Sequence, residues 1–187
     1  MFVCSIANLA KMTEFIYQAV AQILLNITIF VSQYKNMGKE IERKFLLADD
    51  SWRERVESST DMRQGYLSRR VEATLRVRVA GERAWLTVKG ANHGAVRNEW
   101  EYEIPVAEAI EMLSSPGMSD GNVIEKTRHI VWHEGYRWEI DEFHGRHEGL
   151  VGAEGEMREV DDEVPRPGFV GMEVTGNPAY YNSTLAR

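Results

Sequence analysis

The feature of this chain that most constrains its fold is a period of two in the polarity of its residues, which recurs from Lys39 onward. The segment TLRVRV at 74–79 alternates polar and apolar side chains, and RNEWEYEI at 97–104, expected as one strand, sets glutamates against aromatic residues and isoleucine. Such alternation is typical of β-strands that have one apolar and one polar face. With about eight such segments, joined mostly by short turns, the sequence predicts a mainly β, α+β fold of antiparallel strands.

Helical patterns are few in the same part of the chain. They cover roughly 50–57, 106–113 and 178–186, and Pro105 precedes the second of them. Proline is favoured at the start of a helix, where its missing N–H would have no partner anyway. We therefore expect a few helices that flank the strands.

Residues 1–36 differ from the rest. The stretch at 15–31 carries no charge, but it is shorter than the roughly 20 apolar residues of a membrane-spanning helix. Three interpretations remain open. In the first, the protein naturally starts at Met37, and the start of its coding sequence is assigned too far upstream. In the second, the leader is a membrane anchor, and in the third it is a docked or loose helix. We favour the first, which divides the chain into a leader at 1–36 and one domain at 37–187. Residues 15–31 leave a membrane association open.

Charge and cysteine content narrow the range of functions and locations. The net charge is −7 at pH 7, whereas a general nucleic-acid binder is usually basic. Cys4 is the single cysteine of the sequence, so the chain cannot form an internal disulfide and a reducing compartment is expected. We therefore predict a cytoplasmic protein without a nucleic-acid partner.

Ionic side chains recur at alternate positions of the expected strands, and their signs segregate by strand. Charged residues on a polar strand face most often meet water only. The acidic residues here are Glu40, Glu42, Glu99, Glu101, Glu103, Glu139, Asp141, Glu154 and Glu156, and the basic ones are Lys44, Arg76, Arg78, Lys89, Arg97, Lys126 and Arg128. The charged faces either coat a sheet or line a closed barrel, where both signs are costly unless ligands and ions neutralise them.

A polyphosphate bound together with magnesium would satisfy both sets of charges. Hard divalent cations prefer carboxylate oxygens, and magnesium shares its coordination shell with substrate phosphates. Arginine holds phosphate oxygens through two parallel hydrogen bonds, and lysine acts as a point charge. Phosphoryl transfer depends on positioning and charge neutralisation more than on covalent help from the protein.

The order of motifs points to a known family. The stretch EIERK at 40–44 has the form ExExK, and it is followed by QGYL (64–67), LRVR (75–78), LTVKG (86–90), RNEWEYEI (97–104), EKTRH (125–129), WEIDEF (138–143), AEGEM (153–157) and EVTGNPAYYN (173–182). This series resembles the short bacterial branch of the CYTH superfamily, the triphosphate tunnel metalloenzymes, from residue 37 to the C-terminus. Members of that family begin almost directly with ExExK, which supports Met37 as the natural start.

The resemblance implies an eight-stranded antiparallel closed β-barrel whose charged interior forms a tunnel for a triphosphate group. Carried over residue by residue, the catalytic set is Glu40, Glu42 and Lys44. The implied metal ligands are Glu40, Glu42, Glu99, Glu101, Asp141, Glu154 and Glu156, and which of Glu99 and Glu101 reaches metal stays open. The implied phosphate ligands are Lys44, Arg76, Arg78, Lys89, Lys126 and Arg128, with Arg97 as a further candidate. Two ions, Mg²⁺ or Mn²⁺, are expected.

The resemblance also implies a reaction, the metal-dependent hydrolysis of inorganic triphosphate to pyrophosphate and phosphate. Two alternatives remain open. One is a nucleotide-using enzyme of the family, such as a class IV-type adenylate cyclase or a thiamine- or nucleoside-triphosphatase, although no base-reading motif is visible. The other is a non-catalytic polyphosphate-binding module, against which the intact carboxylates argue. The expected partner is a triphosphate-containing small molecule, and a homodimer is a further possibility.

Two groups of uncharged residues carry structural expectations. Gly155 stands where the family often has a branched apolar residue, and we expect it to loosen its strand and to mark a bulge. The recurring tryptophans are expected in the core on the outer face of the strands rather than in nucleotide stacking: Trp85, Trp100, Trp132 and Trp138.

Two further segments contain residues of the kinds found in functional sites. FHGRHEGL at 143–150 contains His144, His147 and Glu148, but it is typical of a loop and we do not expect a metal site there. The sequence YYN at 180–182 is expected to close a C-terminal helix over the strands, with a contact near the tunnel mouth as an alternative.

Overall fold

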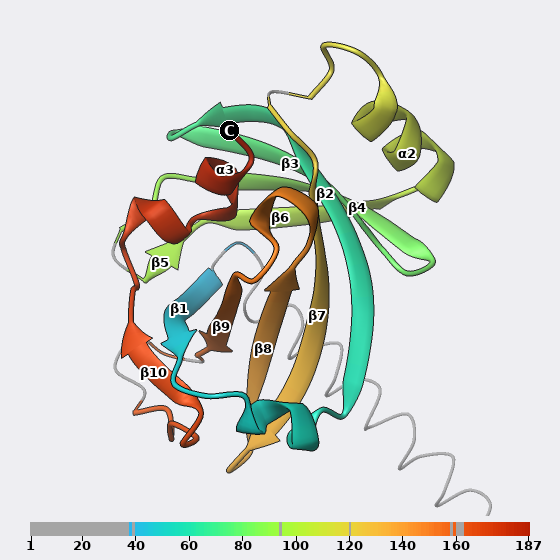
Figure 1. The fold of residues 1–187 in the computed structure, drawn as a ribbon. Coiled ribbons are helices and arrows are strands. Elements are labelled where there is room, and N and C mark those ends of the chain that lie inside the picture. Colours follow the sequence, from blue (N-terminus) through green and yellow to red (C-terminus); the bar gives the residue numbers. More distant parts are fainter. Residues whose placement is uncertain (1–37, 39, 94, 120, 158, 160–162) are drawn as a thin grey trace, which may run out of the picture. The chain divides into compact units, whose positions relative to one another are not determined.

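The computed structural model describes residues 38, 40–93, 95–119, 121–157, 159 and 163–187 (Figure 1). The predicted leader, with Cys4 and the stretch at 15–31, and the predicted start at Met37 lie outside these residues. The described elements are β1 (Glu40–Leu47), η1 (Ser51–Arg55), β2 (Ser58–Arg70), β3 (Ala73–Ala80), β4 (Arg83–Gly90), β5 (Val96–Arg97), β6 (Glu99–Ile104), α2 (Val106–Ser114), β7 (Ile124–His133), β8 (Tyr136–Phe143), η2 (Gly145–His147), β9 (Val151–Glu156), β10 (Val170–Glu173), η3 (Pro178–Tyr180) and α3 (Asn182–Leu185).

The strands form one sheet of ten strands, in which neighbours follow the order β10-β1-β9-β8-β7-β2-β3-β4-β6, while β5 pairs with β1 outside this path. Neighbouring strands along the path are antiparallel. The prediction of a mainly β, antiparallel fold with a few helices is therefore confirmed.

The predicted eight-stranded closed barrel is wrong on both counts. The sheet has ten strands because the segment predicted as one strand at 97–104 divides at Asn98 into β5 and β6, and because β10 adds an edge strand. The path is open because β6 pairs with β4, whereas β5 reaches β1 through only two residue pairs, Glu40 with Arg97 and Ile41 with Val96. A short ladder thus replaces the continuous pairing that closure requires.

The register of the ladders places charged side chains of neighbouring strands on one face. Residues directly opposite each other in an antiparallel pair point to the same side of the sheet. Lys44 of β1 lies opposite Glu154 of β9, and Arg128 of β7 lies opposite Asp141 of β8. These two ladders therefore pair unlike charges, whereas the acidic strands β8 and β9 also lie side by side, with Glu139 opposite Glu154.

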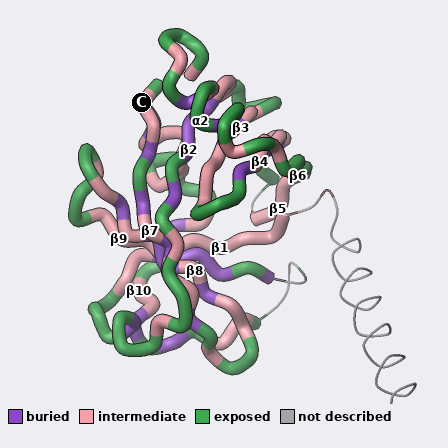
Figure 2. Tube along the Cα trace, turned by 90° about the vertical axis from the view of Figure 1, so that its right-hand side faces the viewer, coloured by how far each residue is buried: buried purple, intermediate pink, exposed green. Residues whose placement is uncertain are grey.

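The opposite face of β1, β7, β8 and β9 carries a hydrophobic core. In Figure 2 the buried positions along β7 and β8 include residues of this core and also charged residues of the other face. Trp52 of η1 and Phe169 before β10 cover this face. The buried members of the cluster are Phe45, Trp52, Val131, Trp138, Ile140, Ala153 and Phe169. Full burial of a large apolar side chain contributes roughly 1.5–3 kcal/mol, so this cluster anchors the strands that carry the charged face.

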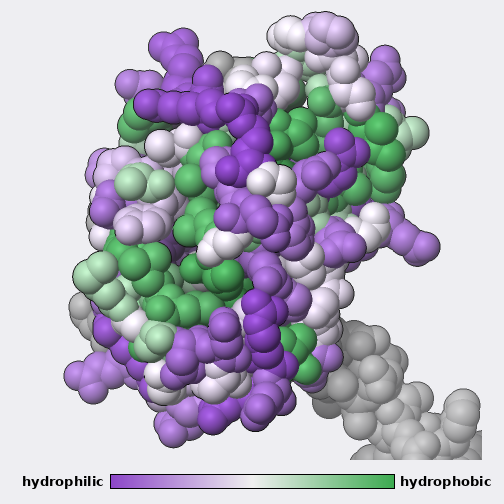
Figure 3. Space-filling view, in the orientation of Figure 1, coloured by the Kyte–Doolittle hydropathy of each residue, from purple (hydrophilic) through white to green (hydrophobic). Residues whose placement is uncertain are grey.

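A second cluster lies where α2 packs on β3 and β4, around Val77, Ala84, Ala109 and Leu113. In Figure 3 hydrophobic residues gather at the upper right, in the region where Figure 1 places α2. This helix confirms the prediction at 106–113. It leaves the charged face of the sheet uncovered because it packs on the other face.

The other two predicted helices are shorter than expected. The pattern at 50–57 forms the single 3₁₀ turn η1, and the pattern at 178–186 divides at Tyr181 into η3 and α3. The backbone of Tyr181 is extended, with φ −79° and ψ 132°, which interrupts the helix. Within the described part of the chain, none of the helices has the length and apolar character needed to cross a membrane.

The tryptophans follow the prediction in one case of four. Trp138 is fully buried in the core, as predicted, but Trp100 and Trp132 are 45% and 53% exposed. Trp85 lies opposite Arg78, with the guanidinium carbon of that arginine 5.3 Å from the centre of its ring. The predicted core position is therefore wrong for these three, because charged neighbours or solvent cover them instead of apolar side chains.

Gly155 does not mark a bulge, so that prediction is wrong. It lies opposite Arg43 and Trp138 in ladders of regular register. A Cβ atom at this position would lie 3.3 Å from Cζ3 and 3.4 Å from Cη2 of Trp138. The glycine makes room for the buried tryptophan.

Gly155→Ala is expected to lower the free energy of unfolding by about 1–3 kcal/mol, because the added methyl group overpacks the indole ring. Gly168→Ala is the matched control, since no atom lies within 4 Å of a Cβ built at that glycine. Urea titration measures both variants. Equal midpoints for the two would show that the core accepts the methyl group and would contradict this account of Gly155.

Candidate active site

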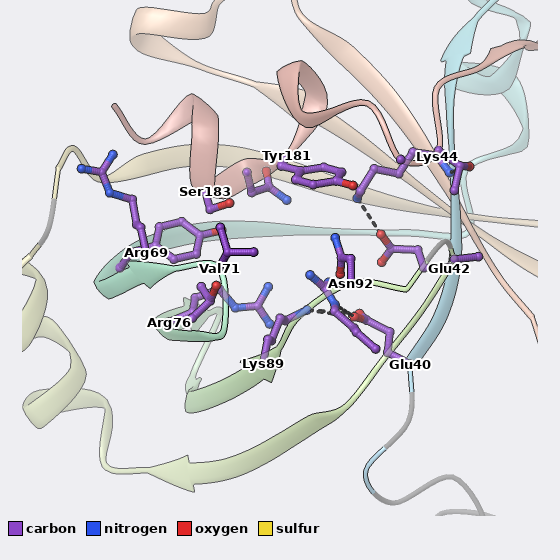
Figure 4. Close-up of a pocket in the computed structure, with 18 residues that line it drawn as sticks. Glu40, Glu42, Lys44, Arg69, Val71, Arg76, Lys89, Asn92, Tyr181 and Ser183 are labelled. Atoms are coloured by element: carbon purple, nitrogen blue, oxygen red, sulfur yellow. Dashed lines mark hydrogen bonds and ion pairs between the residues drawn. The ribbon is translucent and has the colours of Figure 1, made fainter.

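A cavity of about 200 Å³ opens on the charged face of the sheet. In Figure 4, Glu40, Glu42 and Lys44 of β1 face Arg76 of β3 and Lys89 of β4 across it. The rest of its wall comes from Tyr66, Arg69, Val71, Thr74, Gly90, Asn92, Ala95, Arg97, Thr175, Gly176, Tyr181, Asn182 and Ser183. The three motif residues of ExExK therefore share one cavity with two of the predicted phosphate ligands.

Lys44 is held by two carboxylates. Its Nζ lies 2.6 Å from Oε1 of Glu42, and it also donates a hydrogen bond to Glu154 on β9. The backbone N–H of Lys44 donates to Oγ1 of Thr175 at 3.0 Å. Alternation along β1 directs the side chains of Glu42 and Lys44 to one face, and the antiparallel pairing with β9 brings the second carboxylate to the same ammonium group.

Glu40, at the start of β1, is also held by two oppositely charged groups. It accepts hydrogen bonds from Nζ of Lys89 at 3.2 Å, and it forms an ion pair with Arg97. Lys89 also lies 2.7 Å from Oε2 of Glu99. The short β1–β5 ladder places Arg97 directly opposite Glu40, so this ladder supplies a cation to the site.

Two arginines of β3 share one carboxylate of β6. Arg76 and Arg78 each donate to Oε1 of Glu101 at 3.1 Å. Thr87, on β4 between these strands, donates to the same oxygen at 2.8 Å. Arg76 also lies 3.8 Å from Glu99. The carboxylates of β6 thus fix the guanidinium groups that line the cavity.

The remaining predicted residues form a buried cluster on β7, β8 and β9. Arg128 donates to both oxygens of Asp141 at 2.7 Å and to Glu154 at 2.7 Å, and it forms an ion pair with Glu139. Lys126 forms an ion pair with Asp141, and these two side chains are only 1% and 3% exposed. Glu154 therefore joins this cluster to Lys44.

The cations hold two carboxylates in the charged form. Burial acts to raise the pKa of Glu154, but Lys44 and Arg128 outweigh it and hold this pKa well below its usual range. Burial likewise opposes ionisation of Glu40, and Lys89 and Arg97 lower its pKa well below the ordinary value. Both groups are carboxylates at neutral pH, the form that binds metal ions.

Other groups are shifted toward their neutral forms. Burial and the neighbouring Glu154 raise the pKa of Glu42. Burial and a hydrogen bond with Glu40 raise the pKa of Glu99 to about 7. Burial and the nearby Arg128 lower the pKa of Lys126 to about 8. In all three groups the cost of burial and the nearby like charges outweigh the stabilisation of the charged form by its partners.

The structure brings most of the predicted site residues together. They form two networks of ion pairs. The first contains Glu40, Arg76, Arg78, Lys89, Arg97, Glu99 and Glu101. The second contains Glu42, Lys44, Lys126, Arg128, Asp141 and Glu154. Glu156 differs, because its side chain is 65% exposed and its ion pair is with Arg137 at 4.0 Å. Among the described residues, the acidic, histidine and cysteine side chains form no ready-made metal cluster, since cations lie between the carboxylates.

The histidine-containing segment makes local contacts. His144 Nε2 lies 2.8 Å from Oγ1 of Thr127, and His147 Nε2 lies 2.8 Å from the backbone oxygen of Leu185. The segment forms η2 and a turn, which agrees with the prediction of a loop.

Several uncharged residues that contact the charged groups or line the cavity were missed from the sequence. Thr87 lies two positions before Lys89 in LTVKG, so strand alternation alone could have placed it on the charged face. Thr175 and Asn182 come from EVTGNPAYYN, a motif that served to recognise the family but suggested no hydrogen bonds. The contact expected as an alternative for 180–182 is present, because Tyr181 and Asn182 line the cavity.

The sequence model of the CYTH domain matches residues 38–167, the part of the chain that contains both ion-pair networks. The chain belongs to the CYTH family. An inorganic triphosphatase from Acetivibrio thermocellus is 44% identical over 151 residues, which cover 81% of this chain and 95% of that protein.

Solved structures agree with this assignment. That of the inorganic triphosphatase NE1496 is 31% identical to the CYTH chain with a TM-score of 0.57, and the match covers 79% of this chain and 93% of the other. The PH1012 protein from Pyrococcus horikoshii OT3 is 18% identical with a TM-score of 0.52, over 65% of this chain and 80% of the other. The latter likeness shows the fold alone.

In metal-free buffer, the raised pKa of Glu99 is expected to make the protein less stable as the pH rises. A carboxyl group with a higher pKa in the folded state stabilises the fold while it is protonated, and this contribution is lost between the ordinary value of 4.5 and about 7. Glu99→Gln remains neutral at every pH. Its free energy of unfolding should therefore fall less than that of the wild type over this interval.

Urea titrations at both ends of the interval measure this difference, with Glu82→Gln on the exposed turn between β3 and β4 as the control. The control should keep the pH dependence of the wild type. An unchanged dependence in Glu99→Gln as well would mean that Glu99 is already ionised in the folded protein.

Proposed function

We propose that this CYTH protein is a hydrolase that converts inorganic triphosphate to pyrophosphate and phosphate with divalent metal ions. The observation that carries the proposal is the composition of the cavity wall, where Lys44, Arg76 and Lys89 lie beside Glu40 and Glu42. The cations suit phosphate oxygens, and the carboxylates suit hard metal ions. The relative from Acetivibrio thermocellus, which is named an inorganic triphosphatase, supports the same substrate.

The carboxylates fit Mg²⁺ or Mn²⁺ by the chemistry of their oxygen donors. Glu40 and Glu42 would hold the first ion from the cavity wall. A second ion would draw on the carboxylates in ion-pair contact with that wall, which are Glu99, Glu101 and Glu154. Asp141, which shares Arg128 with Glu154, is a further candidate, and the exposed Glu156 is the weakest. When bound, such ions neutralise developing charge and lower the pKa of coordinated water.

Substrate binding requires these ion pairs to change partners. Lys44 is held by Glu42 and Glu154, and Lys89 is held by Glu40 and Glu99. A triphosphate that attracted the two ammonium groups by itself would leave crowded, buried carboxylates without cations, which costs several kcal/mol. If metal ions accompany the triphosphate, Glu40, Glu42, Glu99 and Glu154 would hold them, and every charge would keep a partner.

The size of the cavity favours an inorganic substrate over a nucleotide. Its volume of about 200 Å³ is below the roughly 300–1,000 Å³ of sites that enclose drug-sized ligands. A nucleoside or thiamine group would have to lie outside it. A non-catalytic polyphosphate-binding module would need the cations but not the carboxylates that line the same wall.

We further propose that residues 37–187 form the functional unit and that it works in the cytoplasm. Every described strand ladder lies between Glu40 and Glu173, and the family match begins at residue 38. The cytoplasmic location is supported by the single cysteine of the sequence, as expected in a reducing compartment.

Tripolyphosphate is expected to be hydrolysed much faster than ATP or thiamine triphosphate with magnesium or manganese, because the cavity binds phosphates and has little room for more. Release of phosphate and pyrophosphate is measured for each substrate. Formation of cyclic AMP from ATP at a comparable rate would replace this proposal by the nucleotide-using alternative.

Arg76→Ala shows whether the activity comes from this cavity. Loss of one preorganised phosphate contact should raise the activation free energy by about 2–4 kcal/mol, which lowers kcat/KM roughly 30- to 1,000-fold. Arg63→Ala is the matched control, because it removes only a surface ion pair with Glu125 at 3.1 Å. Equal rates in the two variants would place the active site elsewhere.

A further inference from the structure

Asn182, the first residue of α3, has a side-chain oxygen that nothing in the described structure explains. Its Oδ1 is buried and lacks a hydrogen-bond partner among the described residues. The residue lines the large cavity, and its chain neighbours Tyr181 and Ser183, which line the same cavity, are labelled in Figure 4. A buried acceptor without a donor costs about 1–3 kcal/mol, so such a group in a folded protein calls for an explanation.

The local fold does not need this amide. The backbone oxygen of Asn182 accepts from the N–H of Ala186 at 3.0 Å, and the N–H of Asn122 donates to the oxygen of Ala186 at 2.7 Å. These bonds hold α3 without the side chain. Asn177, a few residues earlier, shows the usual structural use, since its Oδ1 accepts from the N–H of Ala179 at 3.1 Å and caps η3.

Asn182 also lines a second, smaller cavity of about 30 Å³, whose wall includes Lys44, Asp141 and Glu154. One water molecule needs about 10–15 Å³ of such space and two to four polar partners. The small cavity has room for a water molecule, and Asn182, Asp141 and Glu154 are the residues of its wall that can supply polar partners. Asn182 and Lys44 line both cavities, so a water molecule held there lies at the edge of the substrate space.

The chemistry of the substrate identifies what the amide oxygen can bind. Phosphate oxygens are acceptors, so a triphosphate chain offers no donor to Oδ1. Water is a donor, and hydrolysis consumes one water molecule per turnover. We propose that Asn182 is a positioning residue whose Oδ1 holds the attacking water against the bound triphosphate, an inference that rests on the proposed function.

In this step the water oxygen forms a bond to a terminal phosphorus and the anhydride bond to the next phosphate breaks. One water proton stays on the phosphate that is released, and the other is taken up by the pyrophosphate leaving group. Asn182 neither gains nor loses a proton. Its contribution is orientation, for which a displacement of about 1 Å can cost on the order of a hundredfold in rate.

Three variants test the inference: Asn182→Ala, Asn182→Asp and, as the matched control, Asn177→Ala. For each, kcat and KM for tripolyphosphate, the binding of pyrophosphate and the melting temperature are measured. Asn182→Ala should lower kcat about 10- to 100-fold and leave KM and pyrophosphate affinity within about threefold, because the alanine loses the water but not the phosphate ligands. Asn182→Asp retains an acceptor in place and should recover much of kcat, at a higher KM from the added negative charge. Asn177→Ala should keep the wild-type kcat.

Several results would overturn the inference. A kcat for Asn182→Ala within twofold of the wild type shows that the amide does not orient the water. A raised KM with unchanged kcat makes the amide a phosphate ligand. A large loss of melting temperature in both Asn182 variants makes it structural. Absence of tripolyphosphate hydrolysis in the wild-type protein removes the proposed function and this inference together, which separates that failure from the others.

Discussion

Pairing of buried charges is the constraint on which the rest of this structure depends. An ion removed from water without a partner costs several kcal/mol, and the side chains of Lys126 and Asp141 are almost completely removed from water. The register of β7, β8 and β9 brings Arg128, Asp141 and Glu154 within hydrogen-bonding distance. A shift of register by one residue would expose the core and bury the charges unpaired, so the same alternation fixes both faces of the sheet.

The elements of this fold that depend on local pattern could be predicted from the sequence. Alternation identified the strands around 74–79 and 99–104 and assigned their charged faces, and the periodic segment after Pro105 identified α2. The division at Asn98 could not be predicted in the same way, because it depends on which distant strand each half meets. The hydrogen bond from the Lys44 N–H to Thr175 joins residues 131 positions apart, and no periodicity encodes it.

The candidate site shows the same limit. Residue types and spacing identified the cations and carboxylates. They did not show that the ammonium groups of Lys44 and Lys89 are each paired with two carboxylates. The surroundings of Trp85 and the exposure of Glu156 also depend on residues of neighbouring strands, which the local sequence does not reveal. Asn182 was visible only as part of a motif, because its importance lies in a missing hydrogen-bond partner, which is a property of the folded chain.

The central claim is that cations and carboxylates neutralise each other until metal ions and a polyphosphate replace these pairs together. Such an exchange makes the two ligands thermodynamically dependent on each other, typically by about 1–3 kcal/mol, or 5- to 150-fold in affinity. Pyrophosphate, the expected product, reports this without turnover. Its affinity is measured by calorimetry with EDTA and with saturating magnesium, corrected for complex formation in solution. The account predicts binding at least about fivefold tighter with magnesium, and equal affinities under the two conditions would contradict it.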